Sequence, residues 1–341
     1  MSRLRCLTGL LSIAIPALLN AQTYKITDLG TLGGTESIAT AINASGQITG
    51  GSTNASGAYH AFLWANGTMK DLGTLGGPSS QGQSINRSGE IAGYAQLPPV
   101  PAKGGYSRGP VSFYSAFTDT NGTMTALGPV GGVAYGINDS GEVIGEGGSS
   151  ALLWSNGNST DLGSLGGTSG TTQPTAINNA GEVVGYSYLP DGNFRGFYWI
   201  NGVMTALGTL GGDWSQAYGI NSAGQITGTA YTKGNLGAHA FLCGNGAMKD
   251  LGTLGDAYST GTSINTNGVV VGYASVPDSS ETLVYHAFLY SGSKMQDLNK
   301  LIPAKSGWVL TQANGINDSG EIVGYGMING QEHGFLLTPS K

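Results

Sequence analysis

The chain has 341 residues, of which 60 are glycine and 12 are proline, and charged residues make up only 10% of it. An average soluble domain carries about 25% charged residues, so this composition excludes a coiled coil, a charge-rich disordered chain and an ordinary helical bundle. The formal net charge of −6 also makes nucleic acid and anionic membranes poor partners, because both are bound through basic patches.

The first 21 residues are typical of a secretory signal peptide. Arg3 and Arg5 precede a short apolar run, and Ala21 supplies the small residue that is found before a cleavage site. This run is shorter than the stretch of about 20 apolar residues that crosses a bilayer, so no transmembrane segment is expected. The sequence therefore predicts a signal peptide over 1–21 and a single exported domain over 22–341. We expect that domain outside the cell or in a bacterial periplasm.

One phrase, Ile-Asn-x-x-Gly, recurs seven times along the rest of the chain. Its isoleucines follow one another at spacings of 40 to 52 residues and are Ile42, Ile85, Ile137, Ile177, Ile220, Ile264 and Ile316. A repeat period of about 40 to 45 residues is typical of propeller blades. The sequence therefore predicts seven copies of one structural unit.

Each unit contains four short predicted strands, which the first repeat illustrates. The first strand ends at Ile42, the second ends at Gly50, the third covers 60–64 and the fourth covers 68–73. Asn and Gly stand where a type I turn prefers them between the first two strands, and Asn-Gly between the last two is a strong hairpin signal. Each unit is therefore predicted to be a four-stranded antiparallel meander.

The two ends of the chain each carry part of a unit. Residues 24–30 match only a fourth strand, and the C-terminal residues 333–337 match a third strand. Pairing these two segments would remove exposed strand edges. We therefore predict an all-β fold, a seven-bladed β-propeller of four-stranded antiparallel blades whose N-terminal strand completes the last blade. The alternative is an open array of β-repeats.

The repeated phrases His-Ala-Phe-Leu-Trp, Asp-Leu-Gly-Thr-Leu-Gly-Gly and Ile-Asn-x-x-Gly resemble those of the HAF-repeat proteins, a group of predicted bacterial extracellular proteins. The resemblance covers essentially the whole chain after residue 21. It implies secretion and a repeat fold, and it carries over no catalytic residue, ligand or cofactor.

Two sets of repeated side chains are predicted to be structural. Histidine opens the third strand in four units, at His60, His239, His286 and His333. Equivalent residues of adjacent blades lie about 15 Å apart on the strand spacing, too far to share a metal whose ligands lie at about 2 Å, so no metal site is expected. Each histidine is expected to bond the aspartate of the Asp-Leu-Gly phrase of its own blade, namely Asp71, Asp250, Asp297 and Asp28. A recurring aromatic position of the same strand is expected to form core between blades and is occupied by Trp64, Trp154 and Trp199.

The second-to-third-strand loops differ greatly between units, whereas the turns on the opposite face are nearly uniform. Variable loops on a rigid scaffold are where binding usually occurs. Aromatic rings with scattered polar groups suit a sugar or peptide surface, although the same rings would also serve to pack the loops onto the blades. The candidate ligand-binding residues on this variable-loop face are Tyr106, Arg108, Tyr114, Tyr188, Asp191, Trp214 and Asp278.

The function predicted from these features is that of a secreted, non-enzymatic binding module. Its partner is expected to be an extracellular carbohydrate or protein, with no cofactor and no assigned catalytic residue. One alternative is a glycoside hydrolase or lyase that uses acidic loop residues such as Asp191, Asp213 and Asp278. A further alternative is a structural component of an envelope or matrix.

Overall fold

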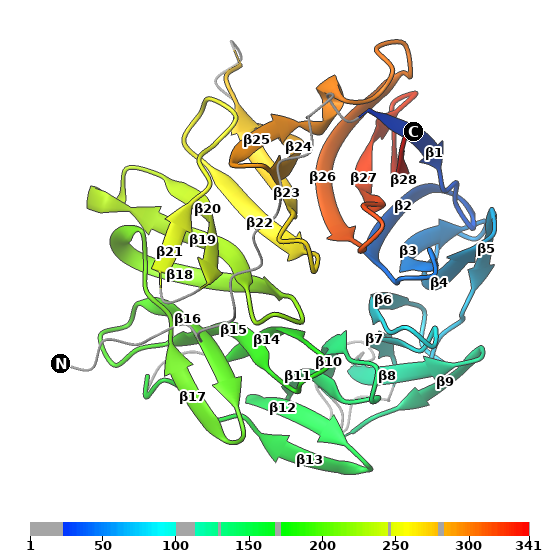
Figure 1. The fold of residues 1–341 in the computed structure, drawn as a ribbon. Coiled ribbons are helices and arrows are strands. Elements are labelled where there is room, and N and C mark those ends of the chain that lie inside the picture. Colours follow the sequence, from blue (N-terminus) through cyan, green and yellow to red (C-terminus); the bar gives the residue numbers. More distant parts are fainter. Residues whose placement is uncertain are drawn as a thin grey trace, which may run out of the picture.

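The computed structural model describes residues 23–99, 113–128, 131–167, 172–244, 247–278 and 283–340. Over these ranges the chain forms 28 strands, arranged as seven four-stranded antiparallel sheets. The sheets surround a common axis as the blades of a propeller (Figure 1). The predicted seven-bladed all-β fold is therefore confirmed. Within the same ranges, no helix is long and apolar enough to cross a membrane.

The strands fall into four concentric positions. The innermost strands are β2 (Gly33–Ile42), β6 (Ser80–Ile85), β10 (Gly132–Ile137), β14 (Gln173–Ile177), β18 (Gly211–Ile220), β22 (Ser259–Ile264) and β26 (Trp308–Ile316). The second strands are β3 (Ile48–Asn54), β7 (Ile91–Gln96), β11 (Val143–Gly147), β15 (Val183–Tyr188), β19 (Ile226–Thr232), β23 (Val270–Val276) and β27 (Ile322–Ile328). The third strands are β4 (Tyr59–Ala65), β8 (Tyr114–Thr120), β12 (Ser150–Ser155), β16 (Phe194–Ile200), β20 (Ala238–Gly244), β24 (Val284–Ser291) and β28 (Gln331–Pro339). The outer strands are β5 (Thr68–Asp71), β9 (Thr123–Ala126), β13 (Asn158–Asp161), β17 (Val203–Ala206), β21 (Ala247–Asp250), β25 (Lys294–Asp297) and β1 (Tyr24–Asp28). Two short 3-10 turns, η1 (Lys233–Asn235) and η2 (Leu298–Lys300), complete the elements.

The N-terminal strand closes the ring, as the sequence predicts. Strand β1 pairs antiparallel with β28 from Tyr24↔Pro339 to Asp28↔Phe335, and the sheet order is β1-β28-β27-β26. Strands β1 and β28 therefore belong to one blade, and their pairing removes the exposed strand edges that they would otherwise leave.

The second strand is longer than predicted. In the first blade it passes through Gly50, where it was expected to end, and continues to Asn54 because Gly51 and Ser52 still pair with β2. The loop that follows therefore covers only 55–58.

Every innermost strand contains a β-bulge at the same position, and a glycine of the second strand lies opposite it. In the fifth blade the bulge lies between Ala217 and Gly219. A Cβ atom on Gly228 would lie 2.0 Å from the backbone oxygen of Gln216, and the corresponding distance is 1.9–2.0 Å in every blade. The bulge therefore requires glycine at this position, which explains why the second strand always contains one. The glycines concerned are Gly50, Gly93, Gly145, Gly185, Gly228, Gly272 and Gly324.

The core lies between neighbouring blades. In six blades a third-strand phenylalanine is completely buried, at Phe62, Phe117, Phe197, Phe241, Phe288 and Phe335. The repeated tryptophan packs with residues of the preceding blade; Trp199, for example, shares a cluster with Ile144 and Ala151. The second blade departs from this pattern, because Asp119 occupies the tryptophan position and is only 2% exposed. One of its oxygens accepts the Gly122 N–H at 2.9 Å, and its other oxygen has no partner among the described residues.

A closed ring of hydrogen bonds joins all seven blades on the tight-turn face. The asparagine of each Ile-Asn-x-x-Gly phrase donates its side-chain N–H to the backbone oxygen of the equivalent asparagine in the next blade, at 2.9–3.2 Å. The members of this asparagine ring are 3% to 6% exposed and are Asn43, Asn86, Asn138, Asn178, Asn221, Asn265 and Asn317. In six blades the same amide also donates to a Glu or Gln four residues later. The repeated phrase therefore encodes both a turn and a bond between blades.

The four histidines contact the aspartates expected for them. His60 Nδ1 lies 2.9 Å from Asp71 Oδ2, and the other three pairs lie at 2.9–3.0 Å. Asp71 Oδ1 also accepts the Gly73 N–H at 2.7 Å, so the pair fixes the end of the outer strand. In the last blade the pair is His333 with Asp28, which ties β28 to β1. Among the described residues, no group of three or more His, Cys, Asp or Glu side chains is placed to hold a metal ion.

Candidate functional site

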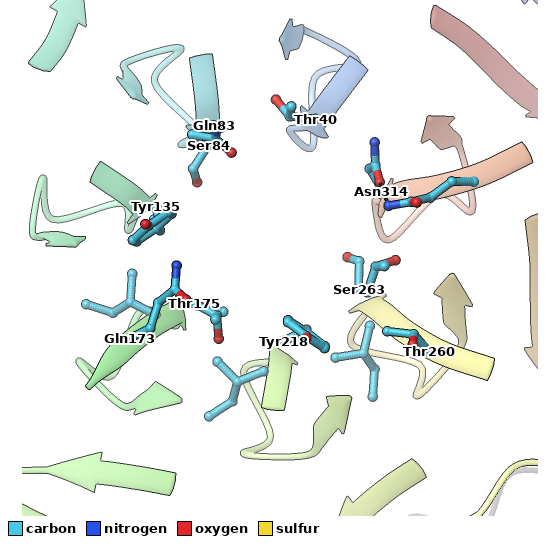
Figure 2. Close-up of a pocket in the computed structure, with 18 of the residues that line it drawn as sticks. Thr40, Gln83, Ser84, Tyr135, Gln173, Thr175, Tyr218, Thr260, Ser263 and Asn314 are labelled. Carbon is cyan, nitrogen blue, oxygen red and sulfur yellow. Dashed lines mark hydrogen bonds between the residues drawn. The ribbon is translucent and has the colours of Figure 1, made fainter. Parts of the chain in front are cut away.

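An axial channel lies at the centre of the ring. Its volume is about 590 Å³, within the range of about 300 to 1,000 Å³ that is usual for small-molecule sites. Figure 2 shows side chains from several blades pointing into it, among them Thr40, Tyr135, Tyr218 and Asn314. The channel is therefore a pocket whose walls are the innermost strands.

The bulges supply one complete layer of the channel wall. A bulge inserts an extra residue and redirects its side chain out of the regular alternation. Here the inserted residue of each innermost strand lines the channel, and the seven residues are Thr40, Gln83, Tyr135, Thr175, Tyr218, Thr262 and Asn314. The same local feature in every blade thus places seven different polar side chains around one axis.

A second layer, closer to the variable-loop face, contains three glutamines that are held by tyrosines. Tyr94 OH donates to Gln81 Oε1 at 2.5 Å, and a glutamine and a tyrosine are joined in the same way in two more blades. Those pairs are Tyr186 with Gln173 and Tyr325 with Gln312. In all three, the two residues are cross-strand partners of the innermost and second strands. Because the tyrosine occupies the amide oxygen, each glutamine keeps its amide N–H groups for other acceptors.

The wall is asymmetric and uncharged. Tyrosines line it in five consecutive blades, the third to the seventh, at Tyr135, Tyr186, Tyr218, Tyr273 and Tyr325. The lining from the first two blades is Ile38, Thr40, Gln81, Gln83 and Ser84. Burial raises the pKa of the Tyr135, Tyr186 and Tyr218 hydroxyls above the ordinary value of 10.0, so they stay neutral. No charged side chain lines the channel within the described ranges.

Towards the asparagine ring the channel is lined by small residues and by the isoleucines Ile177, Ile220 and Ile264. Gly136, Ala176, Gly219 and Ser263 follow the bulge in four of the innermost strands. The innermost strands run from the variable-loop face to the tight-turn face, so this small-residue layer lies below the glutamines and tyrosines. The hydrogen-bonding groups are therefore concentrated at the end nearer the variable loops.

Two half-buried carboxyls lie behind the wall. Burial raises the pKa of Glu146, although a hydrogen bond from Tyr135 opposes the shift. Burial also raises the pKa of Glu332, and the nearby carboxyl of Glu36 raises it further. Glu146 lies directly behind a tyrosine of the channel, whereas Glu332 and Glu36 lie at the seam between the last blade and the first.

None of the described loop residues singled out from the sequence lines the channel. Tyr106 and Arg108 lie outside the described residues. The aromatic candidates contact rings of their own blades: Tyr114 lies 5.4 Å from Tyr94, Tyr188 lies 4.1 Å from Phe194 and Trp214 lies 4.6 Å from Tyr231, measured between ring centroids. These contacts agree with the alternative interpretation, in which the rings pack the loops onto the blades.

The acidic loop candidates also lie outside the channel lining. Asp191 accepts the backbone N–H of Asn193 at 2.9 Å, and this bond lowers the pKa of its carboxyl. Asp213 accepts an amide N–H from Asn235 at 2.6 Å. Asp278 lies in the loop that follows β23 of the sixth blade. The three carboxylates thus belong to three different blades; Asp191 orders a local turn, and Asp213 bonds the 3-10 turn η1.

The sequence did contain a signal for the channel. Glutamine occurs four residues before the isoleucine of Ile-Asn-x-x-Gly at Gln81, Gln173, Gln216 and Gln312, and tyrosine follows the second-strand glycine at Tyr94, Tyr186, Tyr273 and Tyr325. Neither residue is required by turn chemistry or by the core. Polar and aromatic residues repeated without a packing role indicate an interior surface.

Comparison with known proteins supports the propeller fold and does not assign an activity. A family model described as "Protein of unknown function (DUF3466)" matches residues 215–335, less than half of the chain. No curated protein matches the sequence.

Similar solved structures include the β-propeller domain of the Trilobed protease from Pyrococcus furiosus, with 8% identity and a TM-score of 0.50 over 76% of this chain and 82% of that one. An acylaminoacyl peptidase of Pyrococcus horikoshii has 12% identity and a TM-score of 0.51 over 84% of this chain, which spans about half (49%) of the peptidase. A chain of the Mitotic Checkpoint Complex has 12% identity and a TM-score of 0.51, with 96% and 98% covered. At identities this low, the similarity supports the propeller fold alone.

Proposed function

We propose that this protein is an exported binding module that holds an uncharged, hydroxyl-rich ligand of the carbohydrate class in its axial channel. The observation that carries the proposal is the channel lining, which combines amides, hydroxyls and tyrosine rings with no charged side chain over the described residues. Amides and hydroxyls exchange hydrogen bonds with sugar hydroxyls, and aromatic rings pack against the apolar faces of sugar rings. Neutral groups suit a neutral ligand because no buried charge has to be compensated.

The ligand is proposed to enter from the variable-loop face. The glutamine and tyrosine layer lies nearer that face, and the opposite end is surrounded by small residues, isoleucines and the asparagine ring. Loops of different length around the mouth would adjust access while the channel supplies the hydrogen bonds. This arrangement moves the proposed site inward from the loop aromatics to the channel wall.

A melting-temperature screen with a channel-blocking variant tests this proposal. We expect a short neutral oligosaccharide of glucose, galactose, mannose or xylose to raise the melting temperature, since a ligand at about 100 times its Kd adds about 2.7 kcal/mol of stability. Gln83→Trp should remove that increase. The protein should accept the larger ring, because Tyr135 and Tyr218 occupy the equivalent bulge position in other blades.

Trp214→Ala is the matched control, because it removes an aromatic ring from the variable-loop face and leaves the channel lining intact. We expect this variant to retain the sugar-dependent increase. An increase that survives Gln83→Trp but disappears in Trp214→Ala would return the site to the loops. No increase with any of the sugars would contradict the carbohydrate class.

The proposal includes export directed by the first 21 residues. Expression of the full chain in a bacterial host, followed by N-terminal sequencing of the secreted or periplasmic protein, should give a chain that begins at Gln22. Retention of uncleaved protein in the cytoplasm would contradict this part of the proposal. Deletion of residues 2–21 is the control and should abolish export.

A further inference from the structure

A chain of hydrogen bonds connects the channel wall to Glu146. Tyr186 OH donates to Gln173 Oε1, Gln173 is hydrogen-bonded to Tyr135, and Tyr135 is hydrogen-bonded to Glu146. The first two residues belong to the fourth blade and the last two to the third, so the chain crosses a seam between blades. Three of its four members line the channel, and Figure 2 shows Tyr135 and Gln173 on neighbouring strands of the wall.

The ionised carboxylate determines the direction of the whole chain. A carboxylate only accepts hydrogen bonds, so the hydroxyl proton of Tyr135 is directed at Glu146. The Tyr135 oxygen then accepts from the Gln173 amide, whose own oxygen accepts from Tyr186. In this state the Tyr135 hydroxyl has no proton to offer to a ligand in the channel.

Protonation of the Glu146 carboxyl changes which hydrogen-bonding groups the channel wall offers to a ligand. A protonated Glu146 is itself a donor and can give its proton to the Tyr135 oxygen. The hydroxyl proton of Tyr135 is then released towards the channel. We propose that Glu146 is a positioning residue that determines whether the Tyr135 hydroxyl donates to the carboxylate or towards the channel. The site should therefore bind oxygen-acceptor ligands more strongly when Glu146 is protonated. This inference rests on the channel being the binding site.

The surroundings of Glu146 favour such a role. Its equivalents in the other blades are Gly51, Tyr94, Tyr186, Thr229, Tyr273 and Tyr325, so the carboxyl is peculiar to the third blade. Burial raises its pKa above the ordinary 4.5, which brings protonation towards mildly acidic pH. The ionisable groups that act on it are Tyr135 and Tyr186. The neighbouring strands β12 and β14 carry no ionisable side chain, and in β8 Tyr114 contacts the Tyr94 ring while Asp119 lies at the tight-turn end.

A ligand-free experiment tests the hydrogen-bond chain itself. In ¹⁵N-labelled protein, the side-chain amide resonances of Gln173 should shift as the pH is lowered from about 7 to about 4, with the midpoint above that of a free glutamate. The Gln81 amide, held by Tyr94, is the internal control and should not follow this titration. Glu146→Gln and Tyr135→Phe should each abolish the shift. A Gln173 amide that does not titrate, or that still titrates in Glu146→Gln, overturns the inference.

A second experiment tests the effect of Glu146 on binding. It also separates this inference from the proposal that the channel binds carbohydrate. For any oligosaccharide excluded by Gln83→Trp, affinity should rise about fivefold on acidification, the value of one additional neutral hydrogen bond. In Glu146→Gln the affinity should no longer depend on pH over this range. Unchanged affinity in a wild-type protein whose Gln173 amide titrates overturns the inference. Titration of Gln173 in a protein that binds no sugar would instead contradict the proposed ligand and leave the hydrogen-bond chain established.

Discussion

Asn178→Ala is expected to lower the free energy of unfolding by about 3 to 5 kcal/mol. The side chain bonds the backbone oxygen of Asn221 at 3.0 Å, the carboxylate of Glu182 and the backbone N–H groups of Ala180 and Glu182. Alanine would leave these partners unsatisfied in a buried position, and each such group costs about 1 kcal/mol or more. It would also open the asparagine ring at one of its seven links.

Urea denaturation followed by tyrosine and tryptophan fluorescence measures this effect. Asn158→Ala is the control, because its side chain is exposed on an outer strand, and we expect a change of less than about 0.5 kcal/mol. Asn178→Asp should be at least as damaging as alanine, since a carboxylate cannot donate to the Asn221 oxygen. A loss of under about 1 kcal/mol in Asn178→Ala would show that the ring contributes little to stability.

Gly228→Ala is expected to destabilise the protein by about 4 kcal/mol or more, or to prevent folding. The added methyl group would lie 2.0 Å from the Gln216 oxygen and 2.8 Å from the Ala217 Cα, both of them backbone atoms that cannot rotate away. Relief would require the bulge in β18 to shift. Because Tyr218 is the bulge residue, any chain that did fold should also have an altered channel wall.

The measurement is again urea denaturation, together with the sugar-dependent increase in melting temperature for any variant that folds. Gly208→Ala is a suitable control, since a Cβ atom there meets nothing within 4 Å and the backbone does not have a positive φ. We expect it to behave as the wild type. Near-normal stability of Gly228→Ala would mean that the bulge adjusts freely and does not fix the channel.

Much of the fold could be predicted because its signals are local and repeated. The Ile-Asn-x-x-Gly phrase identifies a turn, its spacing identifies a blade, and the partial units at the two ends identify the closure of β1 on β28. The bonds between His and Asp could be predicted for the same reason, since both residues recur at fixed positions. The second role of the asparagines was not predicted, because a turn explains Asn43 equally well and the turn motif alone does not show that Asn86 lies beside it.

The channel lining was harder to predict because a bulge interrupts the alternation on which strand patterns depend. With regular alternation, Gln81, Gln83 and Ile85 would share one face, yet the two glutamines line the channel and Ile85 packs in a core cluster. The packing of the loop aromatics was hard to predict for a different physical reason. Tyr188 and Trp214 each contact a ring on the next strand of their own blade, and a sequence does not show whether a ring in a loop is already packed.

The closure of the ring has a consequence for the order in which the molecule assembles. Neighbouring blades are joined by contacts between residues 53 or fewer positions apart, such as Ile137 with Ser84, Asn138 with Asn178 and Ala61 with Ser80. The contacts that close the circle join residues about 300 positions apart, including Asp28 with His333, separated by 305. A growing chain can therefore complete six blades before the partner of its first strand has been made. Non-local pairing is slow to form, so the joining of β1 to β28 should set the rate at which the finished circle appears.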